Sequence, residues 1–277
     1  MKLQTTVDIP LSPWKIGFDD HILMLGSCFA DSVGEQMAQH GLNVTCNPFG
    51  TLYNPLSIAH ALACSMDQMT FRFHDGLWHS MAHHGAFSRP TEQEAREAVS
   101  CSIETMQNAL REASVVVVTF GTAWVYEMPE MNPTVVGNCH KLPETCFTRR
   151  RFSVQEIVEA WKPLIERYRG KHWLFTVSPI RHVRDGLHEN QLSKATLLMA
   201  VEALTKMCKC SYFPSYEIVL DELRDYRFYA DDLVHPSALA VGYIWERFVD
   251  TFCTPQTKNE LVLRYKQWKH EQHRPLH

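Results

Sequence analysis

The stretch that decides the fold is HILMLGSCFADS, from His21 to Ser32. Its first half is a short apolar run, Ile22–Leu25, which predicts a β-strand. Amphipathic spacing follows from Asp31 to His40 and predicts a helix. A strand that passes straight into a helix through a turn containing glycine and serine is typical of α/β proteins, so we start from an α/β fold.

The same order of strand and helix recurs along most of the chain. Further apolar runs predict strands at Leu42–Cys46, Val115–Phe120, Trp173–Val177 and Tyr216–Leu220. Apolar residues at helical spacing predict helices at Glu92–Glu112, Val154–Arg169, Leu192–Met207 and Ala238–Phe252. The run of four valines is expected to be buried on both faces. The pattern predicts a mostly parallel sheet between helices.

Residues 121–151 interrupt this order. TAWVYE from Thr122 and PTVVGN from Pro133 resemble two short hairpin strands, and NCHKLPETCFTRRR from Asn138 reads as a long irregular loop. The sequence contains no internal repeat and no linker-like tract, and a chain of 277 residues fits one core. We expect a single domain over residues 1–277, with insertions at about 66–90 and 121–151.

The charge and the apolar runs exclude several classes of partner. The formal net charge is −4, so the chain lacks the basic field that binds nucleic acid or anionic membranes. The first residues lack the unbroken apolar stretch of a signal peptide, and no apolar run approaches the ~20 residues that cross a bilayer. We expect a soluble, cytoplasmic protein without nucleic-acid or membrane partners, and its oligomeric state stays open.

Nine cysteines are scattered without a CxxC pair, so neither a disulfide framework nor a structural zinc site is expected, and most of the thiols are expected to be buried. A metal hypothesis rests on four histidines, His74, His79, His83 and His84. HxxxHH is not a zincin motif and has no glutamate beside it, so loop histidines that line a pocket or bond locally are the alternative. We expect no metal and no cofactor.

Ser27 is the first candidate for chemistry. In open α/β sheets, ligands bind outside the carboxyl ends of the strands, and a helix N-terminus offers free N–H groups to an oxyanion. Gly26 allows a tight turn there, although Ser27 is alternatively only the helix N-cap. A second element, DDLVHPS, favours chemistry because Asp232 and His235 lie three residues apart. At that spacing a carboxylate accepts the Nδ1 proton and leaves Nε2 free for a serine hydroxyl.

Two residues compete with Ser27 and His235 for these roles. Cys28 would be the better nucleophile if the helix N-terminus lowered the pKa of its thiol, but only one of two consecutive residues faces the base. His182, in SPIRH, is the main rival base, with Asp185 the one carboxylate at a comparable local spacing.

Ser178 and Arg181 also follow a predicted strand and should lie on the same sheet edge as Ser27. An arginine there suits an anionic or carboxylate-bearing substrate through bidentate contact. The alternative is an ion pair with an acidic residue near Asp221–Asp225.

Five motifs in order resemble one family. GSCFA at residues 26–30 resembles the namesake motif of the GSCFA-domain family, which looks like a branch of the SGNH/GDSL hydrolase superfamily. The other four are NPFGTLYNP from Asn47, NCHK from Asn138, SPIRH from Ser178 and LRDYRFYADDLVHPS from Leu223. The resemblance covers roughly residues 10–250. It implies a three-layer α/β/α, flavodoxin-like fold in which Ser27 is the nucleophile and Asp232 and His235 complete a triad.

The resemblance also implies an oxyanion hole made of the nucleophile's own N–H, a glycine and an asparagine. Gly50 best matches the glycine. The asparagine is absent, because this chain has Ala123 at its place. Losing one such donor costs about 3 to 4 kcal/mol in serine hydrolases. Thr122, Asn54 and Asn138 are the candidates to replace it.

These residues lead us to expect a serine-dependent ester hydrolase that works through an acyl-enzyme. Its partner would be a small-molecule or carbohydrate ester, and an O-acetyl carbohydrate is the analogy that the superfamily offers. Two alternatives stay open: an acyltransferase of the same fold, and a non-catalytic ligand-binding module, which the missing asparagine favours.

Overall fold

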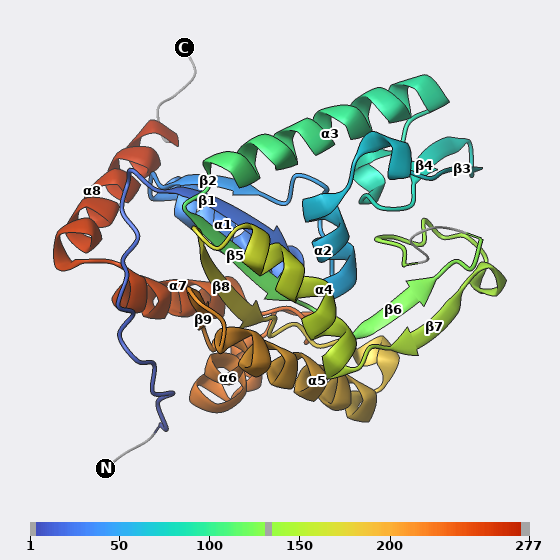
Figure 1. Cartoon of the computed structure of the whole chain (residues 1–277). Coiled ribbons are helices and arrows are strands. Elements are labelled where there is room, and N and C mark those ends of the chain that lie inside the picture. The colour runs from blue at the N-terminus through green and yellow to red at the C-terminus, as the bar shows by residue number, and fades with distance from the viewer. Residues whose placement is uncertain (1–3, 131–134, 273–277) are drawn as a thin grey trace.

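The centre of the protein is a five-stranded sheet in the order β2-β1-β5-β8-β9 (Figure 1). The structure is a computed structural model that describes residues 4–130 and 135–272. The strands of the sheet are β1 (His21–Gly26), β2 (Asn43–Cys46), β5 (Val115–Phe120), β8 (His172–Val177) and β9 (Cys210–Tyr212). Every pairing between them is parallel. The expected α/β architecture with a parallel sheet is therefore confirmed.

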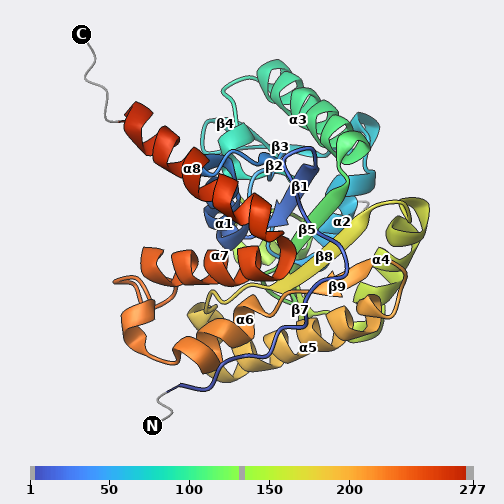
Figure 2. The same ribbon diagram turned by 90° about the vertical axis from the view of Figure 1, so that its left-hand side faces the viewer.

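Helices cover both faces of this sheet (Figure 2). They are α1 (Cys28–Gln39), α2 (Pro55–Ala63), α3 (Glu92–Glu112), α4 (Val154–Arg167), α5 (Leu187–Thr205), α6 (Ser215–Glu217), α7 (Ala238–Phe252) and α8 (Pro255–Gln272). On one face, α1 and α7 pack with Met24 and Val117. On the other, α2 to α5 pack with Leu23 and Val118. Because alternate residues of a strand point to opposite faces and both faces are covered, β1 and β5 are apolar over most of their length, at Ile22–Leu25 and at Val115–Val118.

Two antiparallel hairpins lie outside the sheet, within the two segments expected as insertions. One pairs β3 (Phe71–His74) with β4 (Leu77–Ser80), and the other pairs β6 (Trp124–Glu127) with β7 (Thr148–Arg151).

The partner of β6 differs from the sequence prediction. PTVVGN, predicted as the second hairpin strand, makes a single bridge from Val135 to Glu127, and Pro133 and Thr134 lie outside the described residues. The true partner, β7, lies in the segment predicted as an irregular loop. The strand β7 has the sequence TRRR and pairs through charged side chains. The Arg149 guanidinium, for example, lies 4.1 Å from the centre of the Trp124 ring. A charged strand of this kind gives no apolar alternation to detect.

The fifth strand is also displaced from its predicted position. Residues 216–220 are not a strand, because they belong to α6 and to the π-helical turn Ile218–Leu223 that follows it. Ile218 and Val219, two consecutive residues, are both buried in the apolar cluster that includes α7. Short apolar runs do not distinguish a strand from a buried helix. The observed edge strand, β9, carries the less apolar sequence CSY.

All nine cysteines are free. The sequence predicts that most of them are buried, and fewer are. Only Cys64 and Cys253 are fully buried, while Cys101 and Cys208 are exposed. The other five pack on the margins of the apolar clusters and keep part of their surface in solvent: Cys28, Cys46, Cys139, Cys146 and Cys210.

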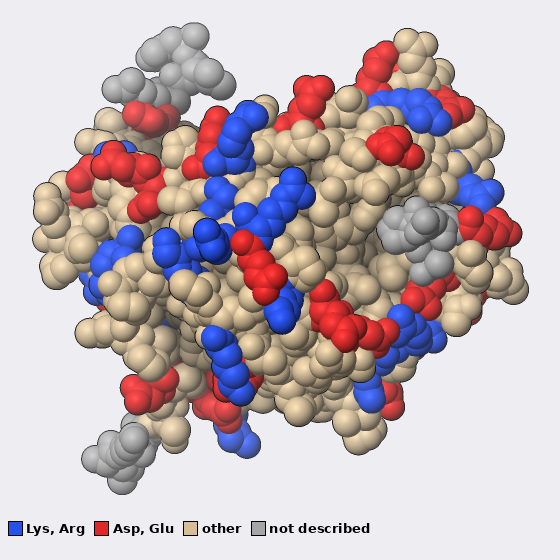
Figure 3. Space-filling model, viewed as in Figure 1, with Lys and Arg blue, Asp and Glu red and all other residues tan. Residues whose placement is uncertain are grey.

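The surface carries charges of both signs. Basic and acidic side chains are interspersed over the face shown in Figure 3. Over residues 4–130 and 135–272, no helix combines the length and the apolar character needed to cross a membrane.

The contact between β1 and β5 can be tested at Gly26, which has φ +140° and lies opposite Thr119. A Cβ at Gly26 would clash with the carbonyl oxygen of Thr119. We expect Gly26→Ala to lower the free energy of unfolding by about 3 kcal/mol or more. In α7, Gly242 has open space around a Cβ, so Gly242→Ala should be neutral or stabilising by up to about 1 kcal/mol. Urea denaturation measures both, and equal stabilities would contradict this close strand contact.

Candidate active site

Ser27 lies at the junction of β1 and α1, at the carboxyl edge of the sheet. Its backbone caps α1, but its side chain makes no capping hydrogen bond. Instead, the Ser27 Oγ donates to the Oγ of Ser178, 3.2 Å away, just after β8. Ser27 has no solvent-exposed surface. The Ser27 hydroxyl therefore does not cap the helix, and its hydrogen bond links the segments that follow β1 and β8.

Asp232 and His235 are in direct contact in the loop before α7. The Nδ1 of His235 lies 2.6 Å from Asp232 Oδ2, and the other carboxylate oxygen accepts the backbone N–H groups of Val234 and His235. Hydrogen bonds from the His235 backbone and ring and from the Val234 backbone lower the pKa of Asp232 to about 2. An ionised carboxylate at this position keeps the proton on Nδ1 and leaves Nε2 free. Both side chains are about half exposed.

Hydrogen bonds from Arg181 hold this loop against the end of β8. The backbone N–H of Arg181 donates to the carbonyl oxygen of Val234 at 3.1 Å, and its guanidinium donates to that of Leu233 at 3.1 Å. Leu233 has φ +56°, so the chain turns sharply there. The loop that carries His235 is thus fixed to the segment that carries Ser178.

The Asp232–His235 pair and Ser27 are not bonded to each other in this structure. Burial raises the pKa of the Cys28 thiol, and the charges of Asp31 and Asp232 add to the rise. Among the described residues, no hydrogen bond joins Ser27 to His235. A raised pKa is the opposite of what a cysteine nucleophile requires, so the surroundings of Cys28 disfavour that alternative.

His182 lacks the surroundings of a general base. Burial, and then the charge of Lys194, lower its pKa to about 3. Asp185, the carboxylate that the sequence offers as its partner, lies 2.5 Å from Arg149 instead. His182 is therefore a weak base, and no carboxylate of the described residues is hydrogen-bonded to it, which leaves His235 the better placed of the two.

Three of the candidate oxyanion donors are engaged in local structure. The N–H of Gly50 donates to the carbonyl oxygen of Asn47 at 2.7 Å, in a turn where Gly50 has φ +75°. Asn54 caps α2, because its side chain accepts the N–H of Ser57 and donates to the hydroxyl of the same residue. Asn138 accepts the backbone N–H two residues further along, at 2.9 Å. In the described residues, none of these three groups is hydrogen-bonded to Ser27.

The loop after β5 lies directly against Ser27. A Cβ on Gly121 would lie 3.5 Å from the Ser27 Cβ and 3.0 Å from the carbonyl oxygen of Tyr53. The N–H groups of Gly121 and Thr122 both donate to that carbonyl oxygen. The Thr122 hydroxyl lies 3.1 Å from a serine hydroxyl of α5. Ala123, where the family resemblance places an asparagine, is buried in the core.

A buried lysine that the sequence analysis missed joins these loops. Lys194, in α5, donates to the carbonyl oxygen of Gly121 at 2.7 Å and to that of Ser178 at 2.6 Å. Its side chain is one of the largest fully buried ones in the described chain. Burial lowers the pKa of Lys194 to about 7, against a smaller opposing effect of Asp185. The amine of Lys194 therefore links the segments that follow β5 and β8.

The position of Lys194 on the apolar face of α5 could have indicated from the sequence that this lysine is buried. The buried face of α5 is apolar at Leu197, Val201 and Leu204, and the same face continues towards the N-terminus through Lys194 and Asn190. Polar residues on the buried stripe of a helix are uncommon unless they are hydrogen-bonded, and they often mark a site.

A comparison with known families covers all of these residues. The GSCFA family profile matches residues 21–248, from β1 into α7. The chain belongs to the GSCFA family. Neither the curated proteins nor the solved structures that were searched include a match. Ser27, Ser178, Lys194 and the Asp232–His235 pair all lie inside the matched GSCFA region.

The histidine-rich hairpin of this GSCFA chain bonds locally. His79 contacts the hydroxyl of Ser88 at 2.7 Å and the carbonyl oxygen of His74 at 3.0 Å. His83 contacts a serine hydroxyl three residues earlier, at 2.8 Å, and burial lowers its pKa to about 3. Within the described ranges, no group of three or more His, Cys, Asp or Glu side chains is placed to hold a metal ion.

The buried amine of Lys194 should make stability depend on pH. Its folded pKa of about 7 lies below the ordinary value of 10.5, so between these values the unfolded chain binds more protons and stability rises with pH. The gap corresponds to roughly 5 kcal/mol at 1.36 kcal/mol per pH unit. The unfolding free energy of wild type relative to Lys194→Met should therefore increase from pH 7 to 10 and be level below pH 7. Urea denaturation across this range measures it, and a difference independent of pH would contradict the lowered pKa of the buried amine.

Proposed function

We propose that this GSCFA protein is a serine-dependent ester hydrolase of the SGNH type. The observation that carries the proposal is the 2.6 Å contact between Asp232 and His235 at the sheet edge that also holds Ser27. Ser27 is the nucleophile, His235 is the general base, and Asp232 keeps the imidazole in the required tautomer. This set of groups suits attack on an ester carbonyl, formation of an acyl-enzyme and its release by water.

The topology supports a three-layer, flavodoxin-like fold for this function. Numbered within the sheet alone, the strands lie in the order 2-1-3-4-5, which is the flavodoxin-like order. In such folds the ligand binds where the strand order reverses, outside the carboxyl ends of the strands. That point lies here between β1 and β5, which are followed by Ser27 and Gly121. A substrate at this crevice would lie against the proposed nucleophile.

Catalysis requires the Ser27 hydroxyl to turn. The Oγ is bonded to Ser178 and has no access to solvent. Rotation of χ1 moves a serine Oγ between staggered positions, and substrate binding would supply the free energy to break the contact with Ser178. The Oγ would then donate to His235 Nε2. Catalytic hydrogen bonds are often long or absent without substrate and form in the complex.

Backbone N–H groups at the start of α1 are the proposed oxyanion donors. The first N–H groups of a helix lack intrahelical partners, and Ser27 is the N-cap residue of α1. The hydroxyls of Thr122 and Ser178 lie on the adjoining loops and would replace the asparagine amide that Ala123 does not supply. A hydroxyl donor of this kind would still stabilise a developing oxyanion.

The proposed substrate is a small-molecule or carbohydrate ester, with an O-acetyl carbohydrate as the first class to test. If a sugar hydroxyl replaces water in the second step, the same residues make an acyltransferase. A non-catalytic ligand-binding module is the second candidate. The complete burial of Ser27 and the alanine at position 123 favour that candidate.

The triad proposal is tested with p-nitrophenyl acetate turnover and fluorophosphonate labelling. Wild type should turn over and label at one serine. Ser27→Ala and His235→Ala should each lose at least about a thousandfold in kcat, because the members of a triad act as a unit. Asp232→Asn should lose comparably, since it removes the charge that orients the imidazole.

Cys28→Ala is the matched control, because it removes the neighbouring thiol and leaves the Ser27 hydroxyl in place. It should keep most of the wild-type turnover. Activity lost in Cys28→Ala and kept in Ser27→Ala would assign the nucleophile to the cysteine. A folded wild type that neither labels nor turns over would instead favour the binding module.

A further inference from the structure

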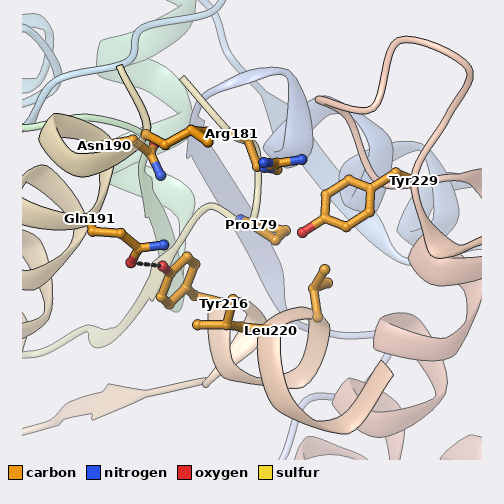
Figure 4. Close-up of a pocket in the computed structure, with 9 residues that line it drawn as sticks. Pro179, Arg181, Asn190, Gln191, Tyr216, Leu220 and Tyr229 are labelled. Carbon is orange, nitrogen blue, oxygen red and sulfur yellow. Dashed lines mark hydrogen bonds between the residues drawn. The ribbon is translucent and has the colours of Figure 1, made fainter. Parts of the chain in front are cut away.

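A small cavity lies beside the proposed triad, between the loop after β8, the start of α5 and the helical turns of α6 (Figure 4). Its volume is about 140 Å³. Pro179, which follows the Ser27 partner Ser178, forms part of its wall, as do Leu187 and Leu220. Cavities of about 150 Å³ hold a molecule of the size of benzene. The space suits a group of about six non-hydrogen atoms.

Arg181 gives this cavity a positive charge, and it forms no ion pair with a carboxylate of the described chain. Figure 4 shows the Arg181 side chain reaching towards Tyr229 at the cavity. Asp221 and Asp225 line an adjoining hollow that also includes Arg181. Each is paired with another arginine, because Asp221 lies 3.5 Å from Arg224 and Asp225 lies 3.0 Å from Arg227. The ion pair that the sequence offered as an alternative role for Arg181 is therefore absent from the described residues.

The other polar groups of the cavity wall are placed as hydrogen-bond donors. The side-chain carbonyl of Asn190 accepts the backbone N–H of His182 at 3.0 Å, and that of Gln191 accepts the Tyr216 hydroxyl at 2.8 Å (Figure 4). With both carbonyl oxygens engaged, each amide NH₂ group remains as a donor. No aspartate or glutamate lines the cavity among the described residues. A wall with one guanidinium and two amide donors fits an anion rich in acceptor oxygens.

We propose that this cavity binds a carboxylate carried on a short apolar chain, as the far end of the acyl group of the substrate. The guanidinium of Arg181 takes the carboxylate, and Leu187 and Leu220 cover the methylenes. The inference rests on the proposed esterase function, and it narrows the substrate to half-esters of short dicarboxylic acids. Pro179 lines the cavity, and the residue before it, Ser178, is the hydrogen-bond partner of the proposed nucleophile Ser27.

Binding without turnover tests the cavity directly. The probes are butyrate and butyramide, which have the same size and differ in charge, titrated against the Ser27→Ala variant by NMR chemical-shift perturbation. Butyrate should bind about 10 to 100 times more tightly, as expected for a charge-assisted pair with arginine. Arg181→Met should remove this preference, whereas Arg184→Met, an exposed cation on the same loop, should keep it.

A second variant separates the cavity from the loop that carries His235, because Arg181 also bonds to Leu233 in that loop. Leu220→Trp fills the space and leaves Arg181 in place. It should abolish butyrate binding without loss of fold. Equal affinities for butyrate and butyramide, butyrate binding retained in Leu220→Trp, or the preference lost in Arg184→Met would each overturn the proposal.

Turnover separates this inference from the esterase proposal. Wild type should prefer mono-p-nitrophenyl glutarate over p-nitrophenyl valerate by about 10 to 100-fold in kcat/KM, and Arg181→Met should bring the ratio close to one. Valerate turnover with no preference for glutarate would overturn the carboxylate subsite and leave the esterase standing. Preferential butyrate binding with no turnover of either ester would support the subsite and overturn the esterase.

Discussion

The parallel pairing of β1 with β5 is the contact on which the site depends. Gly26 lies opposite Thr119, and the absence of a Cβ at Gly26 allows the two strand ends to approach. Because all strands of the sheet run in one direction, their carboxyl ends and the loops that follow meet at one edge. Gly121 then lies against Ser27. A side chain at either glycine would push the loop after β5 away from the proposed nucleophile.

The buried amine of Lys194 links two loops at the same edge of the sheet. The ammonium of Lys194 is taken out of water, and the carbonyl oxygens of Gly121 and Ser178 compensate for part of the lost hydration. The same charge contributes to the low pKa of His182. An arrangement that disfavours positive charge at His182 also favours negative charge near Ser178 and Ser27. Lys194 therefore combines a structural role with an electrostatic one, without direct contact to the proposed reaction centre.

The sequence predicts elements whose structure depends on residues nearby in the chain. It does not predict features that depend on contacts with residues far away in the chain. The strand at Val115–Phe120 and the helix at Glu92–Glu112 have the predicted bounds, because their apolar periodicity is complete within the segment. The contact between Asp232 and His235 follows from a spacing of three residues. Burial of Lys194 and pairing of the charged strand Thr148–Arg151 depend on carbonyl oxygens and an aromatic ring far away in the sequence. Local pattern carries no information about such partners.

The contrast in exposure between the proposed nucleophile and base constrains how the site works. His235 and Asp232 are about half exposed and already paired with each other, whereas Ser27 is fully buried. The hydrogen bond that holds Ser27 to Ser178 joins two neutral hydroxyls, and such a bond contributes only about 1 kcal/mol. A ligand that fills the space beside Ser178 provides several times that amount from buried apolar area alone. Under the proposed function, substrates that fit the neighbouring wall would release the serine, and discrimination between substrates would occur before any bond to the carbonyl carbon forms.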